Sequence, residues 1–344
     1  PQILRDDVVG SEAQRVFSDG KRMLQRLIEG RWLQANGVVA FYPANTVNDD
    51  DIEIYTDDSR TQVALTWYGL RQQTEKQMVP GPDGQALQRP SRCLADFVAP
   101  KGMAPDYLGL FAVTAGVGAD KKSDWFEKDH DDYSAIMLKA LADRLAEAFA
   151  ECLHHRVRTD LWGYAAHEAL AIEALIDEQY QGIRPAPGYP ACPDHSVKKD
   201  MFELLQCTDV GMGLTESLAM TPAASVSGFY LAHPQSCYFN VGRIGDDQLR
   251  ALAQRRTRLR LDHGRQAPGL HRFHRFEREG AAFGIPGRCP ASDQGRHAAF
   301  SRPAPEGNQT RPAPEGDASG LSKRRGETDR PTDKVTRGGR AGFR

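Results

Sequence analysis

Residues 184–195 read RPAPGYPACPDH, and four prolines in twelve residues decide what this segment can be. Proline fixes φ and removes a backbone donor, which excludes a helix interior or a central strand. Gly188 permits a positive φ or a close approach of another group at the bend. The pattern predicts a stiff, extended loop that holds Arg184 and Tyr189 on either side of that bend. The alternative interpretation is a purely structural turn.

Composition divides the 344 residues into two parts. Up to Leu249, apolar runs alternate with charges as in globular proteins, and we predict one folded domain over residues 1–249. From Arg250, arginine, glycine and proline dominate, and RPAPEG occurs twice, at 302–307 and 311–316. Residues 250–344 are predicted to be a low-complexity tail, disordered or read out of frame. A basic tail can also contact nucleic acid or a membrane, but we expect neither partner.

Cysteine usage and hydropathy bear on location. The six cysteines show no pairing rhythm and are expected to be reduced thiols. No apolar run is long enough to span a bilayer, and no signal sequence opens the chain. We therefore expect a cytoplasmic protein.

Hydrophobic periodicity predicts a mixed fold. Helices are expected over residues 12–27, 133–157 and 168–179, and strands over residues 37–42, 51–55, 61–67, 107–115, 225–231 and 237–241. The order lacks a regular βαβ alternation, which favours an α+β domain with a twisted antiparallel sheet and flanking helices. On the long helix, the predicted apolar face consists of Met137, Leu141, Leu145, Ala148, Phe149 and Cys152.

The same long helix carries carboxylates at helical spacing. Asp143 and Glu147 share one face, with Glu151 one turn further on. The plain alternative is a solvated polar face. His154 and His155, near the predicted helix end, are explained by a favourable interaction with the helix dipole.

Motifs for other chemistry are missing from the sequence. The clusters at 192–195 and 130–132 lack the paired spacing of a zinc site, and we expect no metal. Neither a Gly-x-Gly-x-x-Gly turn nor a Ser-His-Asp pattern is evident. We predict no catalytic residue.

Several unrelated motifs occur in an order and spacing that resemble the C-terminal activation domain of cobalamin-dependent methionine synthase. They are DDIEIY at 50–55, LRQQTEK at 70–76, CLADFVAP at 93–100, the run 130–149, the 184–190 loop, SVSGFY at 225–230, HP at 233–234, YFNVG at 238–242 and DDQ at 246–248. The resemblance covers residues 1–248. It implies a module that binds S-adenosylmethionine for reductive remethylation of cob(II)alamin. The parent enzyme transfers a methyl group from 5-methyltetrahydrofolate to homocysteine.

The resemblance also assigns ligand contacts. Arg184 is implied as the partner of the ligand carboxylate, and the carbonyls around Ala186 as acceptors for adenine or the ammonium. Tyr189, Tyr238 and Phe239 are implied as faces for the adenine and the sulfonium. In the family, an aspartate in an Asp-Trp-Thr-Pro-like motif binds the amino group. By spacing it would fall before Pro1, so weaker binding is expected.

Partners follow from the same resemblance. Asp143 and Glu147 are implied at the contact with the cobalamin-binding domain, and Glu147 also at the ligand. A flavodoxin-like donor is implied as the source of the electron. The chain alone is expected to bind without turnover. The alternative is a stand-alone S-adenosylmethionine-binding or scaffold protein without methionine synthase activity.

Overall fold

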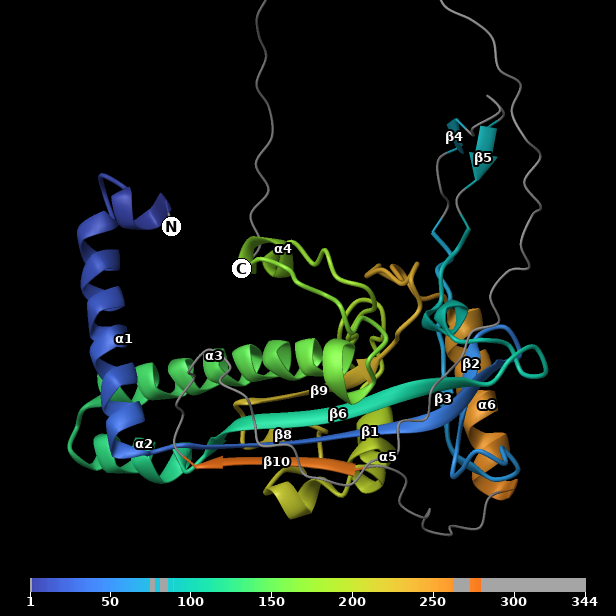
Figure 1. Ribbon diagram of the computed structural model, residues 1–344. Coiled ribbons are helices and arrows are strands. Elements are labelled where there is room, and N and C mark those ends of the chain that lie inside the picture. The colour runs from blue at the N-terminus through green and yellow to red at the C-terminus, as the bar shows by residue number, and fades with distance from the viewer. Residues whose placement is uncertain (1, 75–77, 81–85, 89, 263–272, 280–344) are drawn as a thin grey trace, which may run out of the picture. The chain divides into compact units, whose positions relative to one another are not determined.

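The computed structural model describes residues 2–74, 78–80, 86–88, 90–262 and 273–279. In this part of the chain a six-stranded antiparallel sheet has the strand order β3-β2-β1-β6-β9, and β10 pairs with β1 (Figure 1). Its strands are β1 (Gln34–Val47), β2 (Asp51–Tyr55), β3 (Val63–Tyr68), β6 (Asp106–Val117), β9 (Ser225–Tyr230) and β10 (Phe273–Glu279). Two small sheets pair β4 (Met78–Pro80) with β5 (Ala86–Gln88) and β7 (Gly213–Leu214) with β8 (Met220–Thr221). The predicted α+β class with an antiparallel sheet is confirmed.

Six α-helices occur in the described residues. They are α1 (Gly10–Gly30), α2 (Ala119–Lys128), α3 (Asp132–Arg156), α4 (Ile172–Ile176), α5 (Val197–Leu204) and α6 (Asp246–Asp262). A π-helical turn, η3 (Val157–Leu161), continues α3. Helix α3 packs on β6 and β9, and Figure 1 shows it lying along these strands.

Strand β1 is almost continuously apolar because both of its faces are buried. Val38, Ala40 and Tyr42 belong to the main core cluster on the α5 side. Val39 and Phe41 belong to a second cluster, with residues of α3. Side chains alternate between the faces of a strand, so a central strand covered on both sides needs apolar residues at every position.

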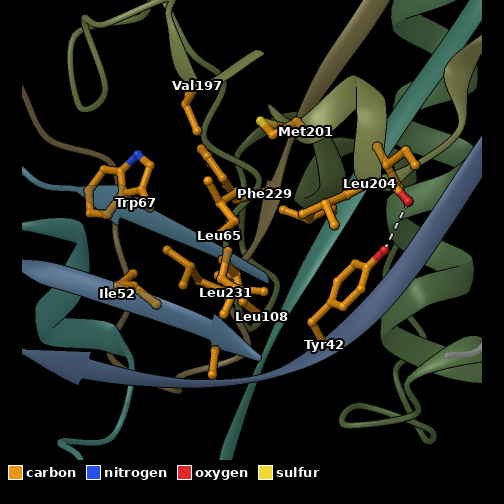
Figure 2. Packing of buried hydrophobic residues seen from close by; sticks show 14 of the residues in the cluster. Tyr42, Ile52, Leu65, Trp67, Leu108, Val197, Met201, Leu204, Phe229 and Leu231 are labelled. Carbon is orange, nitrogen blue, oxygen red and sulfur yellow. Dashed lines mark hydrogen bonds between the residues drawn. The ribbon is translucent and has the colours of Figure 1, made fainter. Parts of the chain in front are cut away.

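Helix α5 covers the sheet face opposite α3. Its Met201 and Leu204 are buried against strand residues of the main core cluster. The Tyr42 hydroxyl donates to the Leu204 carbonyl oxygen at 3.1 Å, as drawn in Figure 2. Burial raises the pKa of Tyr42, because ionisation would place a charge in this apolar layer.

The apolar face predicted for α3 is displaced from the one observed. The buried residues are Ala135, Leu138, Ala142, Ala146, Ala150, Leu153 and His154. Ala148 and Cys152 are exposed, whereas Met137, Leu141, Leu145 and Phe149 are half-buried at the flank. The alanines allow the helix backbone to approach the sheet closely, and the larger side chains fill the space beside the contact.

Three other expectations differ from the structure. The helix predicted over 168–179 is reduced to α4, and Glu168, which precedes it, is bound to Arg158. Residues 237–241 form no strand; they are a loop. Helices α2, α5 and α6 were not predicted.

Helix α6 crosses the boundary predicted at Leu249. Leu252 is buried, and the Arg255 guanidinium pairs with Asp51. Packed structure therefore continues at least to Arg255. Strand β10 also lies within the predicted tail and pairs with β1. Beyond α6 and β10 the predicted tail lies outside the described residues, so its character stays a prediction.

Candidate functional site

The loop that opens at Arg184 runs beside strand β9. Ile183 and Leu231 exchange two backbone hydrogen bonds of 3.0 Å, and the Phe229 N–H donates to the Pro185 carbonyl oxygen at 2.9 Å. A Cβ on Gly228 would lie 2.5 Å from that oxygen, so only glycine permits this approach. The start of the loop is therefore extended, as its proline-rich sequence predicts. It adds a short edge segment to the sheet beside β9.

The bend of the loop lies at Gly188, whose φ is +97°. The Gly188 N–H donates to the Cys192 carbonyl oxygen at 2.7 Å, and the Tyr189 N–H donates to Ala186 at 3.2 Å. The imidazole of His195 lies over Gly188, where an added Cβ would be 2.1 Å from the ring. The bend is closed by its own hydrogen bonds and covered by one side chain.

Arg184 is held on one nitrogen by three side chains. Its Nη1 lies 2.6 Å from the Glu151 carboxylate, 3.2 Å from His154 Nδ1 and 3.3 Å from the Tyr180 hydroxyl, to which it donates. Its backbone N–H donates to the Tyr238 hydroxyl at 3.0 Å. The side-chain contacts within the described residues all use Nη1, which leaves Nε and Nη2 available to a ligand carboxylate.

Burial and charge act in opposite directions on Arg184. Burial lowers the pKa of the guanidinium, but the charges of Glu151, Tyr180 and Tyr238 outweigh it and raise the pKa overall. The side chain is therefore a fixed cation, which suits the planar, bidentate recognition of a carboxylate.

The predicted aromatic contacts occupy two environments. Tyr189 is 61 % exposed and Tyr238 is 39 % exposed, so both retain accessible surface. Tyr238 contacts the backbone of Arg184, and Tyr189 lies further along the same loop. Phe239 is half-buried and packs edge-on against Phe97 at 6.4 Å, so its observed ring contact is with the core. The two tyrosines fit an aromatic surround for a cation or a base better than Phe239 does.

The predicted backbone acceptors are partly occupied. Pro185 accepts from Phe229 and Ala186 accepts from Tyr189, each at a normal hydrogen-bond distance. A carbonyl oxygen has two lone pairs, so each can accept once more.

The carboxylates of α3 lie on the helix that supports Arg184. Asp143 is half exposed and pairs with Arg144 at 2.6 Å, and Glu147 is half-buried one turn before Glu151. The pKa of Arg144 is raised by its hydrogen bond to Asp143 and, more weakly, by the charges of Glu147 and Tyr189. Asp143, Glu147 and Tyr189 therefore lie around Arg144, whereas Arg184 contacts α3 further along the helix, at Glu151 and His154.

A buried polar cluster behind Arg184 was not predicted. Arg158 is fully buried, makes three hydrogen bonds of 2.8–3.0 Å to Glu168, and lies 4.1 Å above the Tyr180 ring. His154 lies in the last turn of α3 as predicted, but it is fully buried, and burial lowers its pKa well below 6.5, so the ring carries no charge at neutral pH that could interact with the helix dipole. Neither the spacing nor the types of these residues distinguish them from surface charges, and we find no sequence signal that reveals them.

Neither a metal site nor a membrane-spanning helix is found among the described residues. No group of three His, Cys, Asp or Glu side chains is placed to hold a metal ion there. None of the helices in this part of the chain is long and apolar enough to cross a membrane.

Comparison with known proteins identifies relatives. The family model described as "Vitamin B12 dependent methionine synthase, activation domain" matches residues 1–257. Among solved structures, the chain is similar to the MetH reactivation domain bound to AdoHcy, with 54% sequence identity and a TM-score of 0.68. That similarity covers 75% of this chain and 76% of the other.

Proposed function

Because the chain belongs to the activation-domain family of vitamin B12-dependent methionine synthases, we propose that it binds S-adenosylmethionine at the 184–190 loop. The observation that carries the proposal is Arg184, a fixed cation with two nitrogens available, on a loop whose backbone is tied to β9. The similar structure holds AdoHcy, the product that remains when S-adenosylmethionine has given up its methyl group. The donor and acceptor set fits a ligand with an amino-acid head, an adenine and a sulfonium.

Each part of the ligand has a matching group in the proposed site. Arg184 binds the carboxylate through two N–H groups, and the carbonyl of Ala186 accepts from the adenine or the ammonium. Tyr189 and Tyr238 present aromatic faces to the sulfonium, an attraction of about 0.5–2 kcal/mol per contact. Glu147 faces the same ligand from α3, and Phe239 supports the site from the core.

The module acts on a cobalamin carried by another domain. Bound S-adenosylmethionine supplies an electrophilic methyl group for reductive methylation of that cobalamin, with an electron from a flavodoxin-like donor. The residues of this chain orient the ligand and present it, and Asp143 and Glu147 face the cobalamin-binding domain. We expect no turnover by the chain alone, because the cobalamin that accepts the methyl group is carried by another domain.

Calorimetric titration of S-adenosylmethionine into wild type and Arg184→Ala tests the assignment. Loss of a charged hydrogen bond costs about 1.5–3 kcal/mol, so the variant should bind roughly 10- to 150-fold more weakly. Arg22→Ala is the matched control, since Arg22 is an exposed arginine on α1 that pairs only with Asp19 among the described ion pairs. No wild-type binding at millimolar ligand, or equal affinity of wild type and Arg184→Ala, would overturn the proposal.

A further inference from the structure

His154 lies at the centre of the buried cluster, with its ring fixed by two tyrosines. The imidazole stacks on Tyr230 with centroids 5.1 Å apart and planes 20° apart. Tyr180 meets it edge-on at 5.0 Å and 83°. The side chain is 0 % exposed, so neither ring rotation nor exchange with solvent is open to it without moving its neighbours.

The contact between His154 and Arg184 determines the protonation of the imidazole. Arginine has donors and no acceptor, so a hydrogen bond from Nη1 at 3.2 Å requires an unprotonated Nδ1. The imidazole must then be neutral, with its proton on Nε2, a buried nitrogen that has no hydrogen-bond partner among the described residues.

The charged groups around the ring favour this neutral form. Arg184 and Arg158 are the cations, Glu151 and Glu168 are the carboxylates that pair with them, and Tyr164, Tyr180, Tyr230 and His155 are the other titratable neighbours. Both carboxylates are engaged by an arginine. An imidazolium would add a third cation to two that are already neutralised by two anions.

We propose that His154 is a positioning residue for ligand binding: its neutral Nδ1 holds Arg184 Nη1, so that the other guanidinium nitrogens are set for the carboxylate of S-adenosylmethionine. This inference rests on the proposed function and adds the residue that orients its main cation. The Glu151 carboxylate and the Tyr180 hydroxyl are the other acceptors around Nη1, so its two N–H groups are shared among three acceptors. Arg158, stacked on Tyr180 and bound to Glu168, keeps that ring in place.

Two substitutions separate positioning from packing. His154→Leu keeps an apolar side chain in the space but removes the acceptor, and His154→Asn places an amide oxygen near the position of Nδ1. We expect His154→Leu to bind S-adenosylmethionine about tenfold more weakly, and His154→Asn to stay within about threefold of wild type. His155→Leu is the matched control on the next residue, which is half-buried and whose backbone carbonyl oxygen accepts from the Thr159 hydroxyl.

The outcome of the titrations on the full chain is decisive in either direction. If wild type binds and His154→Leu binds equally well, the positioning role falls while the proposed function stands. If His154→Asn is as weak as His154→Leu, the acceptor is not what matters and the proposal is overturned. If wild type does not bind S-adenosylmethionine, both inferences fail together.

A spectroscopic measurement on the wild-type chain covers the case in which His154→Leu does not fold. Long-range ¹H–¹⁵N spectra of histidine distinguish the two neutral tautomers from the imidazolium, and the His154 signals are those that disappear in His154→Asn. At neutral pH we expect the tautomer protonated on Nε2. The Nδ1–H tautomer or the imidazolium would exclude a hydrogen bond from Arg184 and would overturn the proposal.

Discussion

Gly188 shows how a single residue shapes the proposed site. Its φ of +97° is in the region that L side chains rarely adopt, and His195 occupies the space where a Cβ would lie. Two separate requirements therefore select glycine at the bend between Pro187 and Tyr189. The two requirements are the positive φ and the space taken by His195. Experiment can separate them, because Gly102 has a positive φ but no neighbour where a Cβ would lie.

Gly188→Ala is expected to destabilise the bend more than Gly102→Ala does. Gly102 has a similar φ of +90° but nothing within 4 Å of an added Cβ. Both variants should bear backbone strain of about 1–2 kcal/mol, and only Gly188→Ala should also displace His195. Urea unfolding measures the loss of stability in each variant, and S-adenosylmethionine titration measures any effect on ligand binding.

Adding His195→Ala to both glycine variants provides the control. The added substitution should recover part of the stability lost in Gly188→Ala and none of the stability lost in Gly102→Ala. Equal losses from the two single glycine substitutions would show that His195 moves aside freely.

His154 should give the protein a pH-dependent stability. Burial, followed by the charges of Arg158 and Arg184, holds the pKa of His154 well below 6.5. Below pH 6.5 the unfolded chain binds a proton that the folded chain does not, so the stability from this residue is present above pH 6.5 and decreases as the pH falls.

We expect the unfolding free energy of wild type, relative to His154→Asn, to fall by up to about 1.4 kcal/mol per pH unit between pH 6 and pH 5. Chemical denaturation of both proteins at each pH measures the difference, in which contributions from carboxylates largely cancel. Parallel pH profiles would mean that His154 titrates normally in the folded chain.

At the scale of elements, the sequence predicts strands better than helix faces. β2 agrees with its predicted range, and β1, β3, β6 and β9 were placed correctly, because apolar runs bounded by turn residues indicate strands whichever face they bury. On α3 the apolar face was drawn through Leu141, Leu145 and Phe149, the largest side chains. The face that meets the sheet consists mainly of alanines, whose low hydrophobicity gives a weak signal even though close packing requires them.

The candidate site, like the fold, was predicted only in part. Arg184 and Tyr189 could be named because prolines and a glycine mark their loop. Arg158 and Glu168 could not, because a buried ion pair uses the residue types of an exposed one, and only the tertiary structure brings η3 and the 163–171 segment together.

Ala146→Leu tests the small-residue contact of α3. Ala146 is 1 % exposed against the sheet, and inserting a larger side chain into a packed layer typically costs about 1–3 kcal/mol. Ala148→Leu, two residues away and exposed, should change stability by less than about 0.5 kcal/mol. Thermal unfolding should therefore show a lower midpoint for Ala146→Leu alone. The opposite ranking would indicate that the face inferred from the sequence is the packed one.

At the scale of the whole molecule, the motifs that suggested the family divide into two groups. Asp50, Arg71 and Asp96 come from three separate motifs and form one ion-pair network, with Arg71 nitrogens 2.7 Å from each carboxylate. This network joins the β1–β2 turn to the segments after β3 and around η2 (Leu94–Phe97), so its role in the observed structure is to hold the chain together. Arg184 of the 184–190 motif instead contacts Glu151 and His154, which follow the 130–149 motif on α3.

Helix α3 connects the proposed ligand site with the proposed contact to the cobalamin-binding domain. It carries Glu151 and His154 against Arg184, and about two to three turns earlier it exposes Asp143 beside Arg144. The charges of Asp143 and Glu147 should therefore matter more to docking on the cobalamin-binding domain than to folding. Exposed substitutions usually change stability by no more than about 0.5 kcal/mol, whereas loss of an interfacial charged hydrogen bond costs about 2–5 kcal/mol.

The double variant Asp143→Asn with Glu147→Gln should melt like wild type but fail to support reductive methylation when supplied in trans to a cobalamin-bearing fragment. Glu203→Gln with Glu216→Gln is the matched control, since it removes two exposed carboxylates in and after α5, which covers the opposite sheet face. S-adenosylmethionine titration of both variants then separates the two roles proposed for Glu147: unchanged affinity with lost reactivation indicates docking, and lost affinity indicates ligand binding. A double variant that reactivates normally would leave these carboxylates as a solvated face, and one that unfolds would make them structural.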